Sequence, residues 1–292
     1  MKLLTLNTHS LQEEDYEQKL EWFIEGILQE KPDIIALQEV NQTAAEAMAD
    51  NVLWEGQCLL PAQVPLKQDN YAAQVVYRLR QAGADCYWVW LPIKLGYGKY
   101  DEGVALLSLG RKITAADSFP ISKSRDYHSW RTRAVLGIQV EGMTDWFYTI
   151  HMGWWDDEEE PFLKQWNKLE EHLAEKRKQK TIWLMGDFNA PDFVSGQSYD
   201  YILNRDWQDT YQTALEKDSG FTVPCVIDGW RERLKNEKWR AMRLDYIFCN
   251  HQIEITSYHV IFNGENRPVV SDHFGVCIEV MEKPMQEGSI NY

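Results

Sequence analysis

Short apolar runs recur along the whole chain, and two longer amphipathic segments interrupt them. The runs cover residues 2–6, 34–38, 104–108, 134–140, 146–150, 182–185, 246–249 and 274–280. Runs of this length and composition, bounded by polar residues, are typical of buried or half-buried β-strands. The chain must therefore build sheets and cover their apolar faces.

Two segments have the period of an amphipathic helix. In residues 15–30 the apolar side chains form one stripe, and Pro32 follows as a stop signal. Residues 162–178 form the second, with a Lys/Arg-rich end that complements the helix dipole. Both helices lie between predicted strands, and in the second half strands follow closely enough for antiparallel pairing. We predict an α/β (α+β) fold, a sandwich of mixed sheets flanked by helices and not a doubly wound parallel sheet.

The chain is predicted to form a single domain over residues 1–292. Its length suffices for one large α/β domain with a sizeable core. No Pro/Gly/Ser-rich linker or internal repeat divides it. Residues 50–67 and 191–243 carry weaker patterns, so we expect them to be long surface excursions.

Charge and cysteine content narrow the class of function. With 30 Lys and Arg against 45 Asp and Glu, the net charge is −15, which opposes a broad electrostatic grip on nucleic acid. The start of the chain lacks the apolar core of a secretory signal, and no stretch approaches a membrane span. Five scattered cysteines suit reduced thiols. The expected compartment is therefore the cytoplasm, with no membrane partner.

Polar side chains stand at the ends of the predicted strands, where a strand holds a side chain next to an open loop. These residues are Asn7, Glu39, His151, Asp187, Asn189, Asp245, Asp272 and His273. Each of them alone is more often a turn residue or a helix cap. Together they form an ordered set of oxygen and imidazole donors.

Seven short segments carry a resemblance to a known family. They are Leu6-Asn7-Thr8, Leu37-Gln38-Glu39-Val40, Glu102-Gly103-Val104-Ala105, Ile150-His151, Gly186-Asp187-Phe188-Asn189, Leu244-Asp245-Tyr246 and Ser271-Asp272-His273. In their order and residues they resemble the endonuclease/exonuclease/phosphatase superfamily, which is built on the fold of pancreatic deoxyribonuclease. The resemblance implies a four-layer sandwich, with two mixed β-sheets packed face to face and helices outside.

The resemblance also implies a metal site. Glu39 matches the family's metal carboxylate, with Asn7 and Asp272 near the same ion. Mg²⁺ is the expected cofactor because it prefers oxygen ligands, and Mn²⁺ is a possible substitute.

Further matches imply catalytic roles. His273 matches the catalytic histidine, and Asp245 is similar to the carboxylate that orients its ring, which suits a general base. Asp187 and Asn189 look like the pair that positions the attacking water and the phosphate oxygens, and some branches hold a second metal there. His151 is expected to bind phosphate or to protonate the leaving oxygen. Bystander roles are expected for His9, His172, His251 and His259, and His128 is left open.

Departures from the family pattern favour one branch. Apurinic-site repair enzymes carry an acid where this chain has His9, and they lack a histidine at the position of His151. The details Asn7-Thr8-His9-Ser10, Tyr100-Asp101-Glu102-Gly103 and His151 followed by Gly153-Trp154-Trp155-Asp156 resemble a Gram-positive bacterial branch that includes maltose 6′-phosphate phosphatase. This similarity implies hydrolysis of a phosphorylated disaccharide.

Two segments are candidates for substrate binding. Arg131 and Arg133 lie in a cationic stretch, and a guanidinium group can bind two phosphate oxygens at once. The alternative is a solvated loop paired with neighbouring acids. Trp154 and Trp155 follow His151 and could stack on a sugar ring or a base. Alternatively, these two indoles anchor the next helix.

The sequence thus predicts a Mg²⁺-dependent phosphomonoesterase that uses an activated water in line. A sugar phosphate such as maltose 6′-phosphate is the expected substrate, and nucleic acid is not an expected partner. One alternative is a phosphodiesterase or nuclease with the same site. Another is a non-catalytic binding protein that kept the fold. The oligomeric state is left open.

Overall fold

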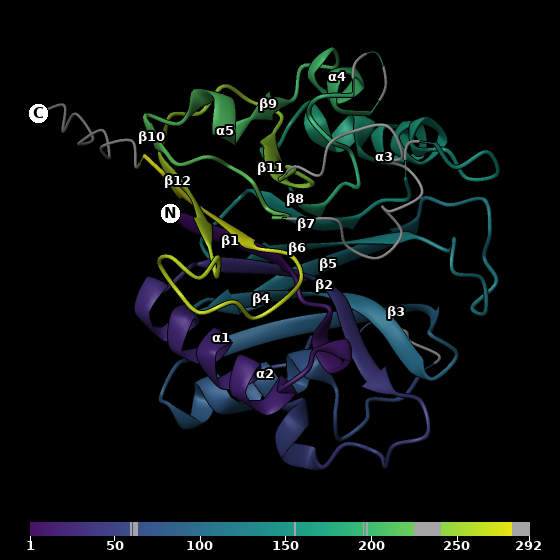
Figure 1. Cartoon of the computed structure of the whole chain (residues 1–292), viewed down its shortest axis with the longest axis vertical. Coiled ribbons are helices and arrows are strands. Elements are labelled where there is room, and N and C mark those ends of the chain that lie inside the picture. The colour runs from purple at the N-terminus through teal and green to yellow at the C-terminus, as the bar shows by residue number, and fades with distance from the viewer. Residues whose placement is uncertain are drawn as a thin grey trace, which may run out of the picture.

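The structure is a computed structural model that describes residues 1–58, 60, 64–154, 156–194, 196, 198–224 and 241–281. Two mixed β-sheets pack face to face (Figure 1). One sheet has seven strands in the order β10 (Glu216–Lys217), β12 (Ile255–Ile261), β13 (Gly275–Val280), β1 (Lys2–Asn7), β2 (Ile34–Thr43), β4 (Tyr100–Leu109) and β3 (Cys86–Gly96). The other has six, in the order β5 (Ile113–Pro120), β6 (Ala134–Val140), β7 (Trp146–His151), β8 (Ile182–Asp187), β11 (Asp245–Cys249) and β9 (Gln208–Asp209).

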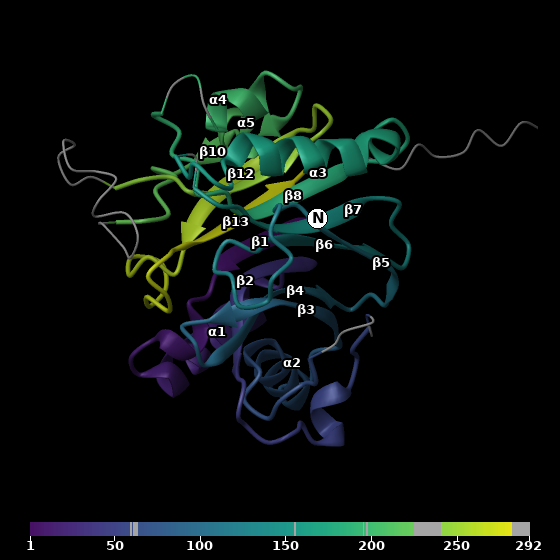
Figure 2. The ribbon, with the colours of Figure 1, turned by 90° about the vertical axis from the view of Figure 1, so that its right-hand side faces the viewer.

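Helices cover the outer face of each sheet, as Figure 2 shows. The seven-stranded sheet is covered by α1 (Tyr16–Glu30) and α2 (Tyr71–Gln81), and the six-stranded sheet by α3 (Phe162–Arg177) and α4 (Ser198–Leu203). Shorter turns are η1 (Ser10–Gln12), η2 (Asn51–Trp54) and α5 (Thr210–Thr213). The predicted four-layer sandwich is confirmed. No helix in the described ranges has the length and apolar character needed to cross a bilayer.

Side-chain alternation along the strands divides the apolar residues among separate cores. In β1, Leu3 packs between the two sheets, whereas Leu4 and Leu6 pack against the helices. In β2, Ile34 packs between the sheets and Ile35 packs on the helix side. Successive side chains of a strand point to opposite faces, so a strand covered on both faces needs a nearly continuous apolar run. This explains the runs in the sequence.

Buried polar side chains link the sheets just before the strands end. Gln38 in β2 donates from Nε2 to Oγ1 of Thr149 in β7 at 2.8 Å. That hydroxyl lies 3.2 Å from the carbonyl oxygen of Leu37, to which it donates. Because these groups are buried, their hydrogen bonds offset the cost of removing them from water. The links fix β2 relative to β7 directly behind Glu39 and His151.

The predicted helices and pairings largely agree with the structure. The segments 15–30 and 162–178 become α1 and α3. Antiparallel pairing in the second half is confirmed for β6 with β7 and for β8 with β11. β13 also pairs antiparallel, with the strand β12 that was not predicted. β7 and β8 are parallel, because α3 connects them and brings the chain back to the end of the sheet at which β7 begins. The described part of the expected excursion 191–243 contains α4, β9, α5 and β10.

Among the longer elements outside that excursion, α2, β3, β5 and β12 were not predicted. Both β3 and β5 are edge strands, and β3 contains Pro92 next to a shift in its register with β4. Proline is a residue that weakens a strand pattern. The missed signal for α2 is its cap, since the Asn70 side chain accepts a hydrogen bond from the Ala73 amide at 3.1 Å.

Replacing a side chain between the sheets should destabilise the protein. Leu106 is fully buried in that core, so Leu106→Ala should lower the free energy of unfolding by about 2–5 kcal/mol. The control Leu215→Ala alters a side chain that is 71% exposed and should cost less than about 0.5 kcal/mol. Urea denaturation measures both. Equal effects would contradict the assignment of this core.

Candidate active site

Three adjacent strands of the six-stranded sheet carry polar side chains at their ends on the same side of the sheet. His151 at the end of β7 pairs in register with Asp187 at the end of β8, and Asp187 pairs with Asp245 at the start of β11. Asn7 at the end of β1 reaches across from the other sheet, because its Nδ2 donates to Asp187 Oδ2 at 3.2 Å. Residues far apart in the chain therefore meet at one edge of the sandwich.

A bulge in β2 directs Glu39 into this site. The pairing of β2 with β4 shifts between Leu37 and Val40, and Glu39 has a φ of 51°. Such a left-handed conformation in a non-glycine residue costs about 1–3 kcal/mol and is concentrated at functional sites. Glu39 Oε1 accepts a hydrogen bond from Asn7 Nδ2 at 3.0 Å and lies 3.9 Å from His151 Nε2.

Asp187 is held in place by its neighbours in the chain. Gly186 has a φ of 144°, and a Cβ there would lie 2.0 Å from a carbonyl oxygen of β7, so only glycine allows this approach. The Asn189 amide donates to Asp187 Oδ1 at 2.8 Å. Asp187 Oδ2 lies 3.7 Å from His151 Nε2. The carboxylate thus faces both the amide of Asn7 and the imidazole of His151.

His273 and Asp245 form a buried pair, with Nδ1 and Oδ2 at 2.8 Å. Burial alone would lower the pKa of His273, but the charge of Asp245 and this hydrogen bond hold it well above its ordinary value. The other carboxylate oxygen, Oδ1 of Asp245, is buried and has no hydrogen-bond partner in the described part of the chain. Asp245 therefore orients the ring of His273, as predicted for this pair by resemblance.

Unlike His273, His151 favours its neutral form. Burial lowers its pKa well below the ordinary value, and the positive charges of Arg133 and Lys94 lower it further. Its imidazole is therefore neutral at neutral pH. A neutral ring has one N–H donor and one acceptor nitrogen, so His151 can donate a hydrogen bond to an incoming anion.

The environment of the site disfavours the charged form of two of its carboxylates. Burial raises the pKa of Glu39, and the charges of Glu102 and Asp272 raise it further. Burial likewise raises the pKa of Asp187 to about 7, although the charge of His273 opposes this rise. A bound cation would favour the ionised form of both carboxylates.

The donor set fits a hard divalent cation. Glu39, Asn7 and Asp272 offer the oxygen ligands that Mg²⁺ and Mn²⁺ prefer. The amide of Asn7 contacts Glu39 directly, and Asp272 lines the same cavity. A second group consists of Asp187, Asp245 and His273, whose potential ligand atoms all lie within 4.8 Å of one another. The residues present therefore suit the expected metal.

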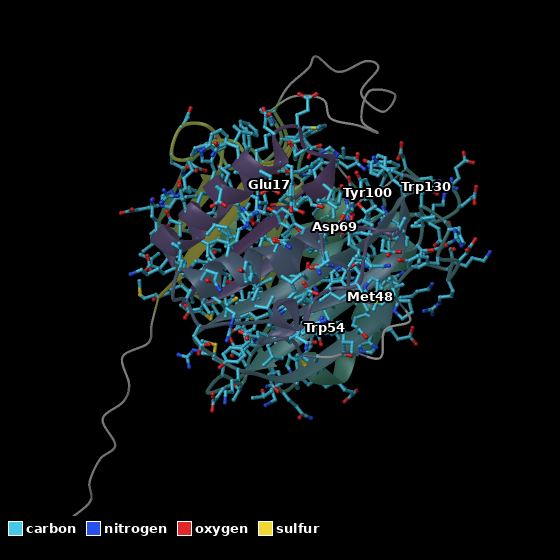
Figure 3. All side chains as sticks on the ribbon, turned by 90° about the horizontal axis from the view of Figure 1, so that it is seen from below. Glu17, Met48, Trp54, Asp69, Tyr100 and Trp130 are labelled. Carbon is cyan, nitrogen blue, oxygen red and sulfur yellow. The ribbon has the colours of Figure 1, made fainter. Side chains whose placement is uncertain are left out.

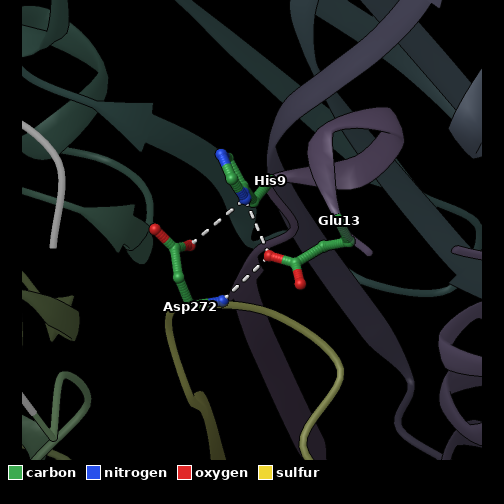
Figure 4. Close-up of side chains that lie close together, drawn as sticks. All are labelled: His9, Glu13 and Asp272. Carbon is green, nitrogen blue, oxygen red and sulfur yellow. Dashed lines mark hydrogen bonds and ion pairs between the residues drawn. The ribbon is translucent and has the colours of Figure 1, made fainter. Parts of the chain in front are cut away.

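His9 lies at this site, although it was predicted to be a bystander. Figure 4 shows its ring between two carboxylates, with Nδ1 2.7 Å from Glu13 Oε1 and 4.0 Å from Asp272 Oδ1. Burial would lower the pKa of His9, but the hydrogen bond with Glu13 and the charge of Asp272 raise it to about 9. His9 therefore lies between Glu13 and Asp272 in the lining of the cavity. Its position two residues after Asn7 was the signal that could have identified it.

The site residues surround a cavity of about 330 Å³. All predicted catalytic residues except Asp245 line it, as do the predicted substrate-binding residues Arg133 and Trp154. Sequence reasoning missed the lining residues Lys94 and Trp130, and it placed Glu102 in a family motif without giving it a role. Trp130 is 44% exposed, and Figure 3 shows it near the edge of the molecule. Its ring centroid lies 5.4 Å from that of Trp154.

Two of the predicted substrate-binding residues are not placed in the cavity. Arg131 lies outside its lining, because its Nε donates to Asp157 Oδ2 at 2.9 Å. Its guanidinium lies over the Trp130 ring at 4.3 Å from the centroid, so it packs on the face of that indole. Direct contact of Arg131 with a substrate stays a prediction. Trp155 lies outside the described residues.

The four remaining histidines lie away from the cavity. His128, His251 and His259 are exposed, and none of the three is among the lining residues that the structure describes. His172 stacks on Phe119 and contacts Asp117 on α3's side of the sandwich. The bystander positions predicted for His172, His251 and His259 agree with the structure, and His128, left open before, also lies outside.

Removing the charge of Asp245 should lower the pKa of His273. Because its pKa is raised in the folded state, protonated His273 stabilises the fold, and this contribution is complete below the unfolded-state pKa. It is lost as the pH rises through the folded-state pKa. An NMR titration of Asp245→Asn in a metal chelator should therefore show His273 losing its proton at lower pH than in wild type. The exposed Asp50→Asn is the matched control. An unchanged titration would contradict the pairing.

Comparisons with known proteins agree with the fold and the motifs. The profile of the Endonuclease/Exonuclease/phosphatase family matches residues 4–273. A structure of an endonuclease/exonuclease/phosphatase family protein from Leptotrichia buccalis C-1013-b is 31% identical with a TM-score of 0.81, covering 97% of this chain and 100% of that one. A search of curated proteins found no match.

More distant structures share the fold alone. The Bacteroides thetaiotaomicron VPI-5482 mannosyl-6-phosphatase Bt3783 is 17% identical with a TM-score of 0.64, covering 97% of this chain and 100% of that one. Truncated TDP2 from Caenorhabditis elegans is 15% identical with a TM-score of 0.59, covering 96% of this chain and 97% of that one. The family match spans nearly the whole chain and includes every strand-end donor described above. This protein belongs to the endonuclease/exonuclease/phosphatase family.

Proposed function

We propose that this family member is a Mg²⁺-dependent phosphomonoesterase that hydrolyses a small sugar phosphate, and that residues 1–292 form one catalytic domain. The proposal rests on the contacts among Glu39, His151 and Asp187, which line one cavity. His151 Nε2 lies 3.9 Å from Glu39 Oε1 and 3.7 Å from Asp187 Oδ2. Carboxylates can hold a metal cation, and a neutral imidazole can donate a hydrogen bond to a phosphate anion. The two groups side by side therefore suit metal-assisted hydrolysis.

Glu39, Asn7 and Asp272 would hold the metal. The ion supplies positive charge that stabilises the phosphoryl oxygens and the charge that develops on them during attack. Glu39 is the central ligand in this proposal because it is half-buried and lines the cavity, and its strained backbone is held at the bulge of β2. Asn7 would contribute its side-chain oxygen, since its Nδ2 already donates to Glu39.

Protons would move through two histidines. His273, oriented by Asp245, accepts the proton of the attacking water, and Asp187 with Asn189 positions that water. In the free protein His273 is protonated at neutral pH, so its action as a base requires a lower pKa once positive charge enters the site. His151 donates a hydrogen bond to the phosphate, and an incoming anion raises its pKa toward protonating the leaving oxygen.

The cavity favours a small ester over a polymer. Its volume of about 330 Å³ is at the small end for ligand pockets. Trp130 and Trp154 at the wall offer flat faces for a sugar ring. The net charge of −15 opposes polyanions. A structural neighbour named as a mannosyl-6-phosphatase and the motif resemblance both support a sugar phosphate, and maltose 6′-phosphate is our first candidate.

A phosphodiesterase or nuclease is the second candidate function. It would use the same carboxylates and histidines, and TDP2 shares the fold. The cationic wall formed by Arg133 could hold a phosphodiester as well. The choice of substrate therefore depends on the walls of the cavity more than on the metal site.

Glu39→Gln should reduce the release of inorganic phosphate from 4-nitrophenyl phosphate by on the order of 100-fold or more. The change removes the charge of the proposed metal ligand and keeps its size. Glu46→Gln is the matched control, because Glu46 is an exposed residue just beyond the same strand. A Glu39→Gln variant with wild-type turnover would remove this carboxylate from the mechanism.

A chelator should abolish turnover, and added Mg²⁺ should restore it. The physical reason is the raised pKa of Glu39 and of Asp187, because a bound divalent cation would stabilise the ionised form of both carboxylates. Phosphate release is measured after dialysis against EDTA and during titration with Mg²⁺ or Mn²⁺. Full activity in the chelator would contradict the metal dependence.

Sugar phosphates should be better substrates than nucleic acid. The assay compares phosphate release from maltose 6′-phosphate and other sugar phosphates with cleavage of plasmid and single-stranded DNA. We expect turnover of at least one sugar phosphate and no comparable cleavage of DNA, because the cavity is small and its surroundings are acidic. Preferential DNA cleavage would favour the second candidate function.

A further inference from the structure

We propose that Lys94 and Arg133 form a site for a phosphomonoester dianion and that this pair makes the enzyme select monoesters over diesters. The inference rests on the proposed phosphoesterase function and assigns a role to Lys94, which sequence reasoning did not single out. Both side chains line the cavity that contains Glu39 and His151. The pair would contact the oxygens of the phosphate group that are not esterified.

Lys94 enters the cavity from the edge strand β3. The register between β3 and β4 shifts between Pro92 and Lys94, which places Lys94 opposite Glu102. The side chain is buried, with the residue only 8% exposed, and Nζ lies 2.9 Å from Glu102 Oε1. Its Nζ also donates to the carbonyl oxygen of Trp130 at 3.4 Å. The ammonium is therefore held at the wall of the cavity.

Arg133 converges on the same point from the other sheet. Its Nη1 donates to the carbonyl oxygen of Trp130 at 2.6 Å, the same oxygen that Lys94 approaches. Arg133 is 6% exposed, and its buried Nε has no hydrogen-bond partner among the residues that the structure describes. A buried guanidinium with an unused donor is costly unless an acceptor arrives. Because Arg133 lines the cavity, an anion bound there would offset the cost of burying its charge.

The segment that carries Trp130 is fastened to the β3–β4 hairpin. The amide of Leu95 donates to the carbonyl oxygen of Tyr127 at 2.6 Å, and the Tyr127 hydroxyl donates to Asp101 Oδ1 at 2.8 Å. The Trp130 carbonyl is thus held near Lys94. The two cations are preorganised, which reduces the reorganisation that anion binding would require.

The local charge balance favours a dianion. Burial lowers the pKa of both Lys94 and Arg133, and the charge of Arg133 lowers that of Lys94 further. Glu102 is the carboxylate in direct ion-pair contact with Lys94, and Arg133 makes no ion pair that the structure describes. A phosphomonoester carries nearly two negative charges at neutral pH, because its second pKa is about 6. A diester carries one charge and would bring a second carbon substituent toward the cations.

The test compares an aryl monoester with an aryl diester. For Lys94→Met, kcat/KM on 4-nitrophenyl phosphate should fall on the order of 10- to 100-fold, as expected for loss of a charged hydrogen bond. Turnover of bis(4-nitrophenyl) phosphate should change far less. The matched control is Lys99→Met, because Lys99 is exposed in the turn between the same strands. It should leave both rates unchanged.

A second pair of variants separates binding from folding. Lys94→Met leaves the Glu102 charge unpaired, whereas Lys94→Gln with Glu102→Gln replaces the ion pair by neutral groups of similar size. The double variant should lose the monoester preference, and Glu102→Gln alone should keep it. Inorganic phosphate in a chelator should raise the unfolding temperature of wild type and of Glu102→Gln, and it should raise that of the double variant less.

The possible outcomes distinguish this inference from the proposed function. A wild-type protein that hydrolyses neither ester fails the proposed function itself. A wild-type protein that is active but favours the diester overturns the inference and supports the phosphodiesterase named above as the second candidate function. Equal losses on both esters in the double variant would also overturn it, because Lys94 would then have only a structural role.

Discussion

Burial of several carboxylates at one edge of the sandwich is the constraint on which the rest of this site depends. Asp187 and Asp245 are buried at the paired ends of β8 and β11, and the half-buried Glu39 of β2 lines the same cavity as Asp187. Buried charges are costly unless they are paired and hydrogen-bonded. His273 and the amide of Asn7 supply part of that pairing, and the raised pKa values of Glu39 and Asp187 show that more positive charge can be accommodated.

The fold sustains this arrangement because the strands themselves hold the side chains. Gln38 and Thr149 link the two sheets behind the site, and the bulge at Glu39 and the close approach at Gly186 set where the acids point. A site built on packed strands keeps its geometry without a bound ligand. Local strain at Glu39 is tolerable because the surrounding sandwich determines its position.

The cavity has two walls of opposite charge. The carboxylate wall suits a cation, and the wall of Lys94 and Arg133 suits the anion that the cation would help to activate. The neutral ring of His151 lies near the carboxylates, and the positive charges of Arg133 and Lys94 help to lower its pKa. The carboxylates would serve the hydrolytic chemistry that the family shares. The choice of substrate would then depend on the cations and indoles that line the rest of the cavity.

By itself, the sequence determined the layered sandwich and the strand-end donors, because strand periodicity and the residue type that ends a strand are local properties. The tertiary structure alone decided which other side chains join the donors. Lys94 comes from an edge strand interrupted by Pro92, and its position depends on a register shift that no local pattern encodes. His9 and Trp130 reach the cavity through loops. Their partners are distant in the chain, so their roles follow only from how the sheets and loops pack together.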